Sequence, residues 1–186
     1  CGYIDSNTLR AGYPESKRCG EALCQAYKKQ ENLDVVIPRF TRSYGPTMLK
    51  TDTKAISQFI KKAVDSENIV LKSAGTQYYS YTYVADAVAG FLTVLLKGES
   101  GEAYNIADEA SDIMLKDLAK IIADFAGKEV VFELPDETEE AGYSKATKAR
   151  LDGSKLKKLG WNAKYDIKQG LERTMKMLTD KQVKNG

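Results

Sequence analysis

The sequence predicts an α/β fold in which the strands pair mainly in parallel. Short β-branched and aliphatic runs alternate along the chain with longer segments whose apolar residues recur every three or four positions. The short runs indicate strands buried in a sheet, and the longer segments indicate helices that cover it. The chain has 186 residues, 42% of them hydrophobic and 29% charged, which suits one large domain or two small lobes.

The first helix is expected to begin near Pro14, which suits the first helical position, and to run to about Lys29. Tyr13 and Lys17 are four residues apart, so they lie one turn apart on one face, and Gly20 leaves room beside them. A different face carries an apolar stripe that is expected to pack on the core, formed by Cys19, Ala22, Leu23 and Ala26.

Tyr13 and Lys17 form a Y-x-x-x-K pattern with a definite chemical use. A nearby ammonium favours the ionised form of a phenol, so such a tyrosine can exchange a proton with a sugar hydroxyl near neutral pH. The spacing alone also suits a solvated helix face, because tyrosine and lysine are common residues. The order of the segments that follow decides between the two interpretations.

Strands and helices alternate through the rest of the chain. A strand is expected within residues 34–40, ending near Pro38, because proline cannot donate to a sheet. Residues 41–46 are expected to form a loop at the carboxyl end of that strand, where open α/β sheets bind ligands. Helices are also expected over residues 53–65, 84–97, 115–126, 154–159 and from Asp166 onward, and strands over 69–72, 103–107 and 128–133.

Two segments leave alternatives open. Residues 75–83 read as a loop or an edge strand in which Tyr79, Tyr81 and Tyr83 share one face, either as core packing or as a stacking platform. Residues 134–149 read as a charged loop whose acidic cluster, Asp136-Glu-Thr-Glu-Glu140, is solvated or binds a metal. The cluster lacks the alternating ligand spacing of a calcium loop, so no metal site is expected.

Charge and residue content exclude several classes of protein. The net charge is +2 without a long basic run, and no apolar stretch approaches the roughly 20 residues of a membrane span, so neither nucleic acid nor membrane is an expected partner. The absence of histidine excludes His-based triads and His-ligated metals. The three cysteines fit no disulfide or zinc spacing, which favours a reducing, cytoplasmic setting. The chain opens on Cys1 without an initiator Met, and we expect a fragment.

Five short stretches occur in one specific order along the chain. They are Tyr13-Pro-Glu-Ser-Lys17 with Glu21; Arg39 through Tyr44-Gly45-Pro46; Tyr83-Val84-Ala85-Asp86-Ala87; Tyr104-Asn105-Ile106-Ala107; and Asp152-Gly-Ser-Lys155 with Leu159-Gly160-Trp161 and Gly170-Leu171. Each is weak alone, but the ordered set resembles the carboxyl-terminal half of the NAD-dependent epimerase/dehydratase family. These are extended short-chain dehydrogenases that act on sugar nucleotides.

The resemblance implies the carboxyl-terminal part of a Rossmann-like doubly wound parallel sheet with a smaller mixed α/β substrate lobe. Residues 1–46, with returning elements near 83–107, would belong to the NAD-binding domain, and residues 47–186 mostly to the sugar-nucleotide lobe. The glycine-rich amino-terminal half is absent, and no Gly-x-x-Gly-x-x-Gly loop occurs to cradle the dinucleotide pyrophosphate. We therefore expect this chain alone to bind NAD weakly or not at all and to be inactive.

The resemblance also implies roles for single residues. Tyr13 would be the catalytic acid/base, and Lys17 would hold the nicotinamide ribose and favour the ionised form of Tyr13. The backbone around Pro38 and Phe40 would pass near the nicotinamide, with NAD expected rather than NADP. A hydride taken from the sugar would allow epimerisation, dehydration or decarboxylation. The nucleotide-diphosphate sugar would be contacted by Arg42, Lys54, Tyr79 and Arg150.

Two positions depart from the family pattern. Arg42 stands where the family usually has Asn, and Tyr79 stands where it usually has Arg. In the family both positions tend to contact the substrate diphosphate. One hypothesis is an exchange, in which an arginine lost at position 79 is regained at position 42 and a charge-assisted contact is preserved. The alternative is that Arg42 is a solvated loop residue.

The leading functional hypothesis is an NAD-dependent sugar-nucleotide enzyme like dTDP-glucose 4,6-dehydratase or UDP-glucuronate decarboxylase. The alternatives are a non-catalytic scaffold or regulator and a reductase of small carbonyls. Retention of Tyr13 and Lys17 speaks against a scaffold, and the long substrate lobe suits a bulky nucleotide. Family members commonly pair through the Tyr/Lys helix, which implies a homodimer, although its exposed side, with Arg18, Gln25 and Lys29, is not strongly apolar.

Overall fold

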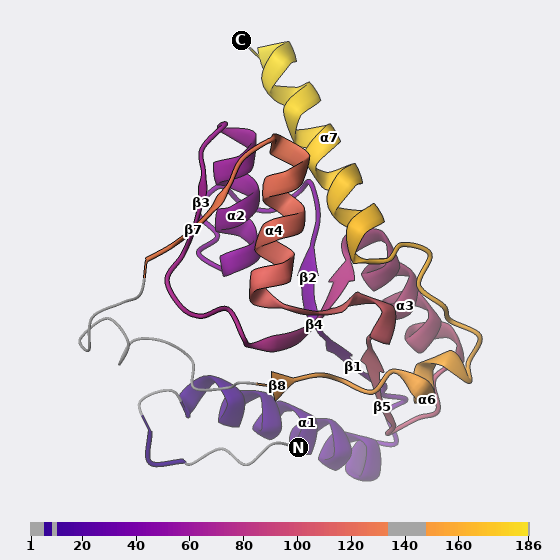
Figure 1. Cartoon of the computed structure of the whole chain (residues 1–186). Helices are drawn as coiled ribbons and strands as arrows, with labels where there is room; N and C mark the ends of the chain where they lie inside the picture. The colour runs from indigo at the N-terminus through magenta and orange to yellow at the C-terminus, as the bar shows by residue number, and fades with distance from the viewer. Residues whose placement is uncertain (1–5, 9–10, 134–147, 186) are drawn as a thin grey trace.

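The computed structural model describes residues 6–8, 11–133 and 148–185, so the acidic cluster at 136–140 lies outside the described residues (Figure 1). The helices are α1 (Gly12–Glu31), α2 (Ala55–Val64), α3 (Val84–Lys97), α4 (Leu115–Ala126), α6 (Ser154–Lys157) and α7 (Ile167–Asn185), with a 3-10 turn at Glu109–Ser111. The strands are β1 (Ile37–Phe40), β2 (Arg42–Tyr44), β3 (Ile69–Leu71), β4 (Tyr78–Tyr83), β5 (Ala103–Ile106), β6 (Asp112–Met114), β7 (Val130–Phe132) and β8 (Lys148–Ala149).

The strands of the described residues form three small sheets. β1 pairs with β5, β3 pairs with β7, and β4 lies between β2 and β6 and also pairs with β8. All of these pairs are parallel except β4 with β6. The predicted α/β class with mainly parallel pairing is therefore confirmed.

The larger core lies where α2, α4 and α7 pack side by side against the strands, as the upper part of Figure 1 shows. Ile60, Leu118, Ile122 and Leu171 are fully buried in it. Tyr79, Tyr81 and Tyr83 are buried in the same core, so the interpretation as core packing is confirmed. The prediction of a loop or edge strand at 75–83 is wrong, because β4 has paired strands on both sides.

A smaller core joins α3, β5 and α6. It contains Val94, Tyr104, Ile106, Leu156 and Trp161, all of them buried. Trp161 donates its indole N–H to the Asp86 carbonyl (3.2 Å), and the Asp86 carboxylate accepts backbone N–H groups from Lys164 and Tyr165. These bonds connect the segment after α6 to the first turn of α3.

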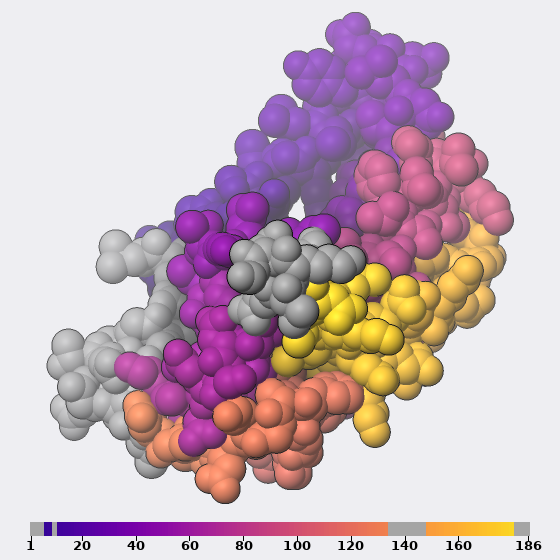
Figure 2. Space-filling view, turned by 90° about the horizontal axis from the view of Figure 1, so that it is seen from above, coloured from indigo at the N-terminus to yellow at the C-terminus, as the bar shows by residue number. Residues whose placement is uncertain are grey.

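The first helix differs from the prediction in two ways. It begins at Gly12 rather than Pro14, because Ala11 already has helical dihedrals and its carbonyl accepts the Glu15 N–H. Pro14 fits inside the first turn, where no intrahelical partner is needed for its missing N–H. None of the helix is buried, and the stripe expected to pack on the core, Cys19 to Ala26, faces outward with Leu23 53% exposed. Figure 2 shows α1 as a ridge that projects from the body of the chain.

Two further predictions near the first strand are wrong in detail. β1 covers only Ile37–Phe40 and continues through Pro38 instead of ending there. Proline is tolerated because β1 pairs with a strand on only one side among the described residues. Residues 42–44, expected in a loop, form β2, because they pair with the central strand β4 and bury Tyr44.

The remaining helices and strands agree closely with the sequence. The helix bounds at 84–97 and 115–126 are confirmed, and Gly127 ends α4 with a φ of 63°. The outward side of α3 nevertheless stays exposed along an apolar row made of Val88, Phe91, Leu92, Leu95 and Leu96. α3 therefore forms where the pattern predicts it, but the described residues do not cover all of its apolar surface.

Candidate functional site

Tyr13 and Lys17 face a hollow between α1 and β1. The Lys17 ammonium nitrogen lies 5.4 Å from the centroid of the Tyr13 ring, so the side chains are neighbours as the spacing predicts. The hollow measures about 590 Å³ and is also lined by Gly20 and by Val36 to Phe40, including Pro38. A Cβ at Gly20 would meet nothing within 4 Å, so the space beside the pair is open. All four residues expected near the cofactor therefore line one hollow.

Polar contacts attach α1 to the strand beneath this hollow. Arg39 of β1 donates two hydrogen bonds to the Glu21 carboxylate, one of them from Nε to Oε1 at 2.7 Å. These bonds hold the pKa of Glu21 below its ordinary value. Further along the helix, Gln25 and Lys28 donate to the carbonyls of Gly101 and Ser100 at 2.6 and 2.7 Å. The face that carries Tyr13 and Lys17 is thus turned toward β1 by side-chain hydrogen bonds.

A second hollow, of about 500 Å³, opens between α2, the β3 end and β4. Arg42, Lys54 and Tyr79, three of the four residues expected to contact substrate, line it together. The Arg42 guanidinium lies over the Tyr79 ring, with its central carbon 3.6 Å from the ring centroid. Burial raises the pKa of neighbouring Tyr81 to about 12, although the charge of Arg42 acts in the opposite direction.

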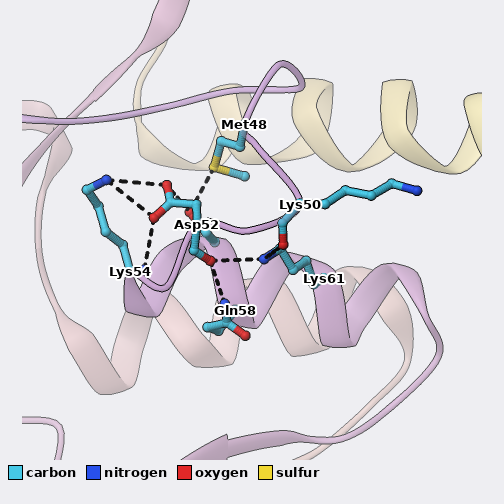
Figure 3. Close-up of polar contacts among 7 residues, drawn as sticks. Met48, Lys50, Asp52, Lys54, Gln58 and Lys61 are labelled. Carbon is cyan, nitrogen blue, oxygen red and sulfur yellow. Dashed lines mark hydrogen bonds and ion pairs between the residues drawn. The ribbon is translucent and has the colours of Figure 1, made fainter.

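The loop before α2 is held in place by Asp52 (Figure 3). Its carboxylate accepts the backbone N–H of Lys54 at 3.0 Å and the hydroxyl of Ser57 at 2.9 Å, while its carbonyl accepts from Gln58 and Lys61. The Lys54 N–H bond is the main reason that the pKa of Asp52 is lowered. These bonds hold the loop that leads into α2 and keep the Lys54 ammonium, which is 3.3 Å from Asp52, beside the hollow that Lys54 lines.

Arg150, the fourth residue expected to contact substrate, lines a different hollow of about 370 Å³ with Asp112, Asp152 and Lys157. Its guanidinium donates to Asp112, whose side chain is 2% exposed and also accepts the Ser80 hydroxyl at 2.6 Å. Arg150 is therefore already engaged by a buried carboxylate. The structure does not bring it into the Arg42 hollow.

Sequence reasoning did not select two polar residues that line the Arg42 hollow, Lys72 and Gln77. Lys72 directly follows β3 at its carboxyl end, which is where ligand contacts gather in parallel sheets. That position is a usable signal. Gln77 gives no comparable signal, because its segment reads equally well as a loop.

The described part of the chain supports neither a metal site nor a membrane-spanning helix. It contains no group of three or more Asp, Glu or Cys side chains placed to hold a metal ion. None of the helices within it combines the length and the apolar character needed to cross a membrane.

The architecture is that of one part of a Rossmann-type α/β protein, with parallel strands joined by helices and hollows at the strand ends. The family model of the NAD dependent epimerase/dehydratase family matches residues 4–107. The chain belongs to this family.

Curated relatives include UDP-glucuronic acid decarboxylase 2 from Arabidopsis thaliana, 30% identical over 94% of this chain and 38% of the relative. The dTDP-D-glucose 4,6-dehydratase of Mus musculus is 30% identical over 88% of this chain and 46% of the relative. The chain thus spans less than half the length of these proteins.

Solved structures show the same fold. A dTDP-glucose 4,6-dehydratase from Bacillus anthracis in complex with NAD superposes with a TM-score of 0.79 at 22% identity, covering 98% of this chain and 58% of the other. The UDP-glucose 4-epimerase of Thermotoga maritima with UDP-glucose gives a TM-score of 0.80 at 24% identity, covering 92% of this chain and 54% of the other.

Proposed function

We propose that this chain supplies the acid/base pair and the substrate pocket of an NAD-dependent sugar-nucleotide epimerase, dehydratase or decarboxylase. The observation that carries the proposal is the contact between Lys17 and Tyr13 at the open hollow beside β1, inside the segment that matches the family. The relatives named as UDP-glucuronic acid decarboxylases and dTDP-glucose 4,6-dehydratases favour substrates of the UDP- or dTDP-sugar type.

The hollow fits one end of a dinucleotide. Its walls combine a cation and a phenol with the backbone of β1 at Pro38 and Phe40, which suits a ribose and a flat ring. The chain has no glycine-rich loop to cradle a pyrophosphate, so it fits the nicotinamide end only. When bound, NAD would accept a hydride from a carbon of the sugar.

Two residues of this chain would transfer the proton of the sugar hydroxyl and stabilise the negative charge on the phenolate. The Tyr13 phenolic oxygen would take the proton of the sugar hydroxyl as its carbon is oxidised, and would return a proton later in the cycle. Lys17 would donate hydrogen bonds to the nicotinamide ribose and stabilise the phenolate that proton transfer requires. Both groups lie on the first two turns of α1, so a single rigid element sets their separation.

The proposal is tested by incubating the complete enzyme, including its dinucleotide-binding part, with NAD and a panel of UDP-, dTDP-, CDP- and GDP-sugars. Absorbance of NADH and the mass of the product report the reaction. We expect turnover of at least one nucleotide sugar. No turnover with any member of the panel would favour a scaffold or regulator, and turnover of small carbonyls alone would favour a reductase.

We further propose that the complete protein pairs with a second copy through α1. Its outward side exposes Leu23 and Tyr27, each more than half accessible, beside the polar Arg18 and Lys29. Burying these side chains against their symmetry mates would favour association. Sedimentation of the complete protein and of a Leu23→Lys variant tests this proposal, with a shift toward monomer expected for the variant.

A further inference from the structure

A further hollow lies on the outer surface, where the segment that follows Trp161 enters α7. It measures about 370 Å³ and shares no lining residue with the Tyr13–Lys17 hollow or the Arg42 hollow. Its walls come from the end of that segment and from one side of α7, through Lys164, Tyr165, Gln169, Glu172, Arg173 and Lys176. Three of these side chains are cationic and one is acidic, so the hollow carries a net positive charge.

The wall formed by Lys164 and Tyr165 is fixed by a buried carboxylate. Asp86 is 3% exposed and accepts the backbone N–H groups of both residues, at 2.9 and 3.0 Å. The Tyr165 ring packs edge-on against the buried Tyr83 ring, with the two centroids 5.1 Å apart. This wall therefore belongs to the folded framework and needs no ligand in order to form.

Arg173 is held against the same wall by two tyrosines. The central carbon of its guanidinium lies 4.9 Å from the centroid of the Tyr165 ring. A hydrogen bond with the Tyr83 side chain is the main reason that the pKa of Arg173 is raised above its ordinary value. A guanidinium that stacks on a ring keeps N–H groups on its edge that can still donate, and its planar fork suits oxyanions such as phosphate.

The cap of α7 leaves Gln169 with a donor to spare. Its side-chain oxygen accepts the Asp166 N–H at 3.1 Å, while the Asp166 carboxylate accepts the Gln169 N–H at 2.8 Å. This reciprocal pair is a capping box, and it uses the oxygen of the amide. The amide nitrogen of Gln169 is therefore able to donate to a ligand. Gln169, Arg173 and Lys176 lie on one face of α7, because they are spaced by four and then three residues.

The cations of this hollow have no acidic partner within the described part of the chain. Lys164, Arg173 and Lys176 form no ion pair there, although Glu172 lies among them. Arg39 and Arg150, in contrast, each pair with a carboxylate. The volume falls within the range of small-molecule sites, which begins at roughly 300 Å³. An anion of small size would supply the acceptors that these donors lack.

We propose that this hollow binds a small phosphate-bearing anion through Lys164, Arg173 and the amide of Gln169. A phosphate presents oxygens in several directions, so it can accept from the loop on one side and from α7 on the other. Lys176 would add a contact for a diphosphate. The site is separate from the two hollows of the proposed function, so its ligand should bind without displacing a sugar nucleotide.

The test is an NMR titration of this chain, isotope-labelled, with inorganic phosphate and with pyrophosphate. The signals of the Gln169 side-chain amide and the Arg173 Nε–H should shift together, with a dissociation constant of about 1 mM or lower. Arg173→Gln should raise that constant about 10- to 100-fold, because a charged hydrogen-bond donor is lost. The matched control is Lys168→Gln, since Lys168 is exposed on α7 but does not line the hollow. It should bind both phosphates as wild type does.

A substitution at Gln169 separates the proposed donor from the helix cap. Gln169→Glu keeps an oxygen that accepts the Asp166 N–H, so its thermal unfolding should match that of wild type. It removes the N–H donors and adds a negative charge, and it should therefore weaken pyrophosphate binding about tenfold or more. Unchanged affinity in a folded Gln169→Glu variant would remove Gln169 from the site.

Three further results would overturn the inference. The absence of shifts at Gln169 and Arg173 with millimolar phosphate or pyrophosphate would remove the site. Equal weakening in Lys168→Gln and Arg173→Gln would show a diffuse attraction to the charged surface of α7. Binding of an oligoglutamate peptide without binding of either phosphate would assign the hollow to an acidic protein partner. Turnover of sugar nucleotides by the complete enzyme is measured separately, so either proposal can fail while the other stands.

Discussion

The two hollows of this chain are built by different forces. The Tyr13–Lys17 hollow is closed on one side by α1, which buries no residue and is attached through hydrogen bonds from Arg39, Gln25 and Lys28. The Arg42 hollow is walled by elements of the large hydrophobic core. Packing within this chain therefore fixes the proposed substrate pocket, whereas a few polar contacts fix the proposed acid/base pair.

The largest expected effect is a loss of catalytic rate at the Tyr13–Lys17 hollow without a loss of ligand affinity at the Arg42 hollow. Tyr13→Phe removes the oxygen that we propose transfers the proton, and it should lower kcat of the complete enzyme about 10²- to 10⁴-fold. Because Tyr13 lies outside the Arg42 hollow, the affinity for UDP should not change. Steady-state kinetics and calorimetry measure the two quantities. Tyr27→Phe, on the same helix and also exposed, is the control and should leave kcat unchanged.

Two outcomes would count against this prediction. A kcat that falls less than tenfold would remove Tyr13 from proton transfer. A parallel loss of UDP affinity would show that the two hollows are coupled, contrary to the comparison.

The second largest effect is expected in stability. Substitutions in the large core should lower the free energy of unfolding much more than substitutions on α1. Ile122→Ala empties a fully buried position between α4 and its neighbours and should cost about 2–5 kcal/mol of unfolding free energy. Leu23→Ala on the outward face of α1 should cost about 0.5 kcal/mol or less in this chain. Urea unfolding followed by circular dichroism measures both. Similar losses in the two variants would mean that α1 is packed as firmly as the core.

The same contrast explains what the sequence could predict. Local patterns placed α3 and α4 at the correct residues, because helix periodicity and a terminal glycine are local signals. The Y-x-x-x-K spacing likewise placed Tyr13 beside Lys17, because helix geometry alone sets that distance.

Burial could not be predicted from the same patterns. The apolar side chains of Leu23 on α1 and of Leu95 and Leu96 on α3 indicate a covered surface, but no described residue covers them. Their partners are not determined by periodicity. The chain spans only 53–58% of the solved relatives, and we propose that elements of the remaining part cover α3.

The prediction of a loop at residues 42–44 was wrong, and the position of Arg150 was not predicted, because both depend on pairing between strands that are distant in sequence. Residues 42–44 look like a loop after Pro38, yet they pair with β4, a strand that begins more than thirty residues later. The Arg42 hollow depends on this pairing, because it brings Arg42 next to Tyr79. Arg150 gives a second example. Its ion pair with Asp112 requires that β6 and β8 both pair with β4, and local sequence does not predict these pairings.

A smaller effect is expected at the loop before α2. Asp52→Ala removes the acceptor of the Lys54 N–H and of the Ser57 hydroxyl, and the lost hydrogen bonds should cost about 0.5–1.5 kcal/mol of unfolding free energy. Asp52→Asn keeps an oxygen acceptor and should cost less. UDP affinity should fall in Asp52→Ala because Lys54 loses its fixed position at the hollow. Equal stability of the Ala and Asn variants would show that the hydrogen bonds of Asp52 do not hold the loop.

The smallest stability effect is expected at the contact that attaches α1. Glu21→Gln weakens the pairing with Arg39, and because both side chains are about one-third exposed it should cost only about 0.2–1 kcal/mol. The folded-state pKa of Glu21 lies below its ordinary value of 4.5. The stabilisation is therefore complete above that value and is lost as pH falls through the lowered pKa. Urea unfolding near neutral pH and near pH ~3 should show the difference from wild type shrinking in acid.

Activity should respond to this contact more than stability does. Among the described residues, the Glu21–Arg39 pair supplies the ion pair that holds α1 to β1, and it lies one turn beyond Lys17. A small shift of α1 would move Tyr13 relative to a bound sugar, and misplacement of about 1 Å can cost roughly 10²-fold in rate. The double variant Glu21→Arg/Arg39→Glu restores opposite charges and should recover part of kcat in the complete enzyme. If the single variant keeps full kcat, then other contacts fix α1, and the polar attachment seen here is dispensable for the reaction.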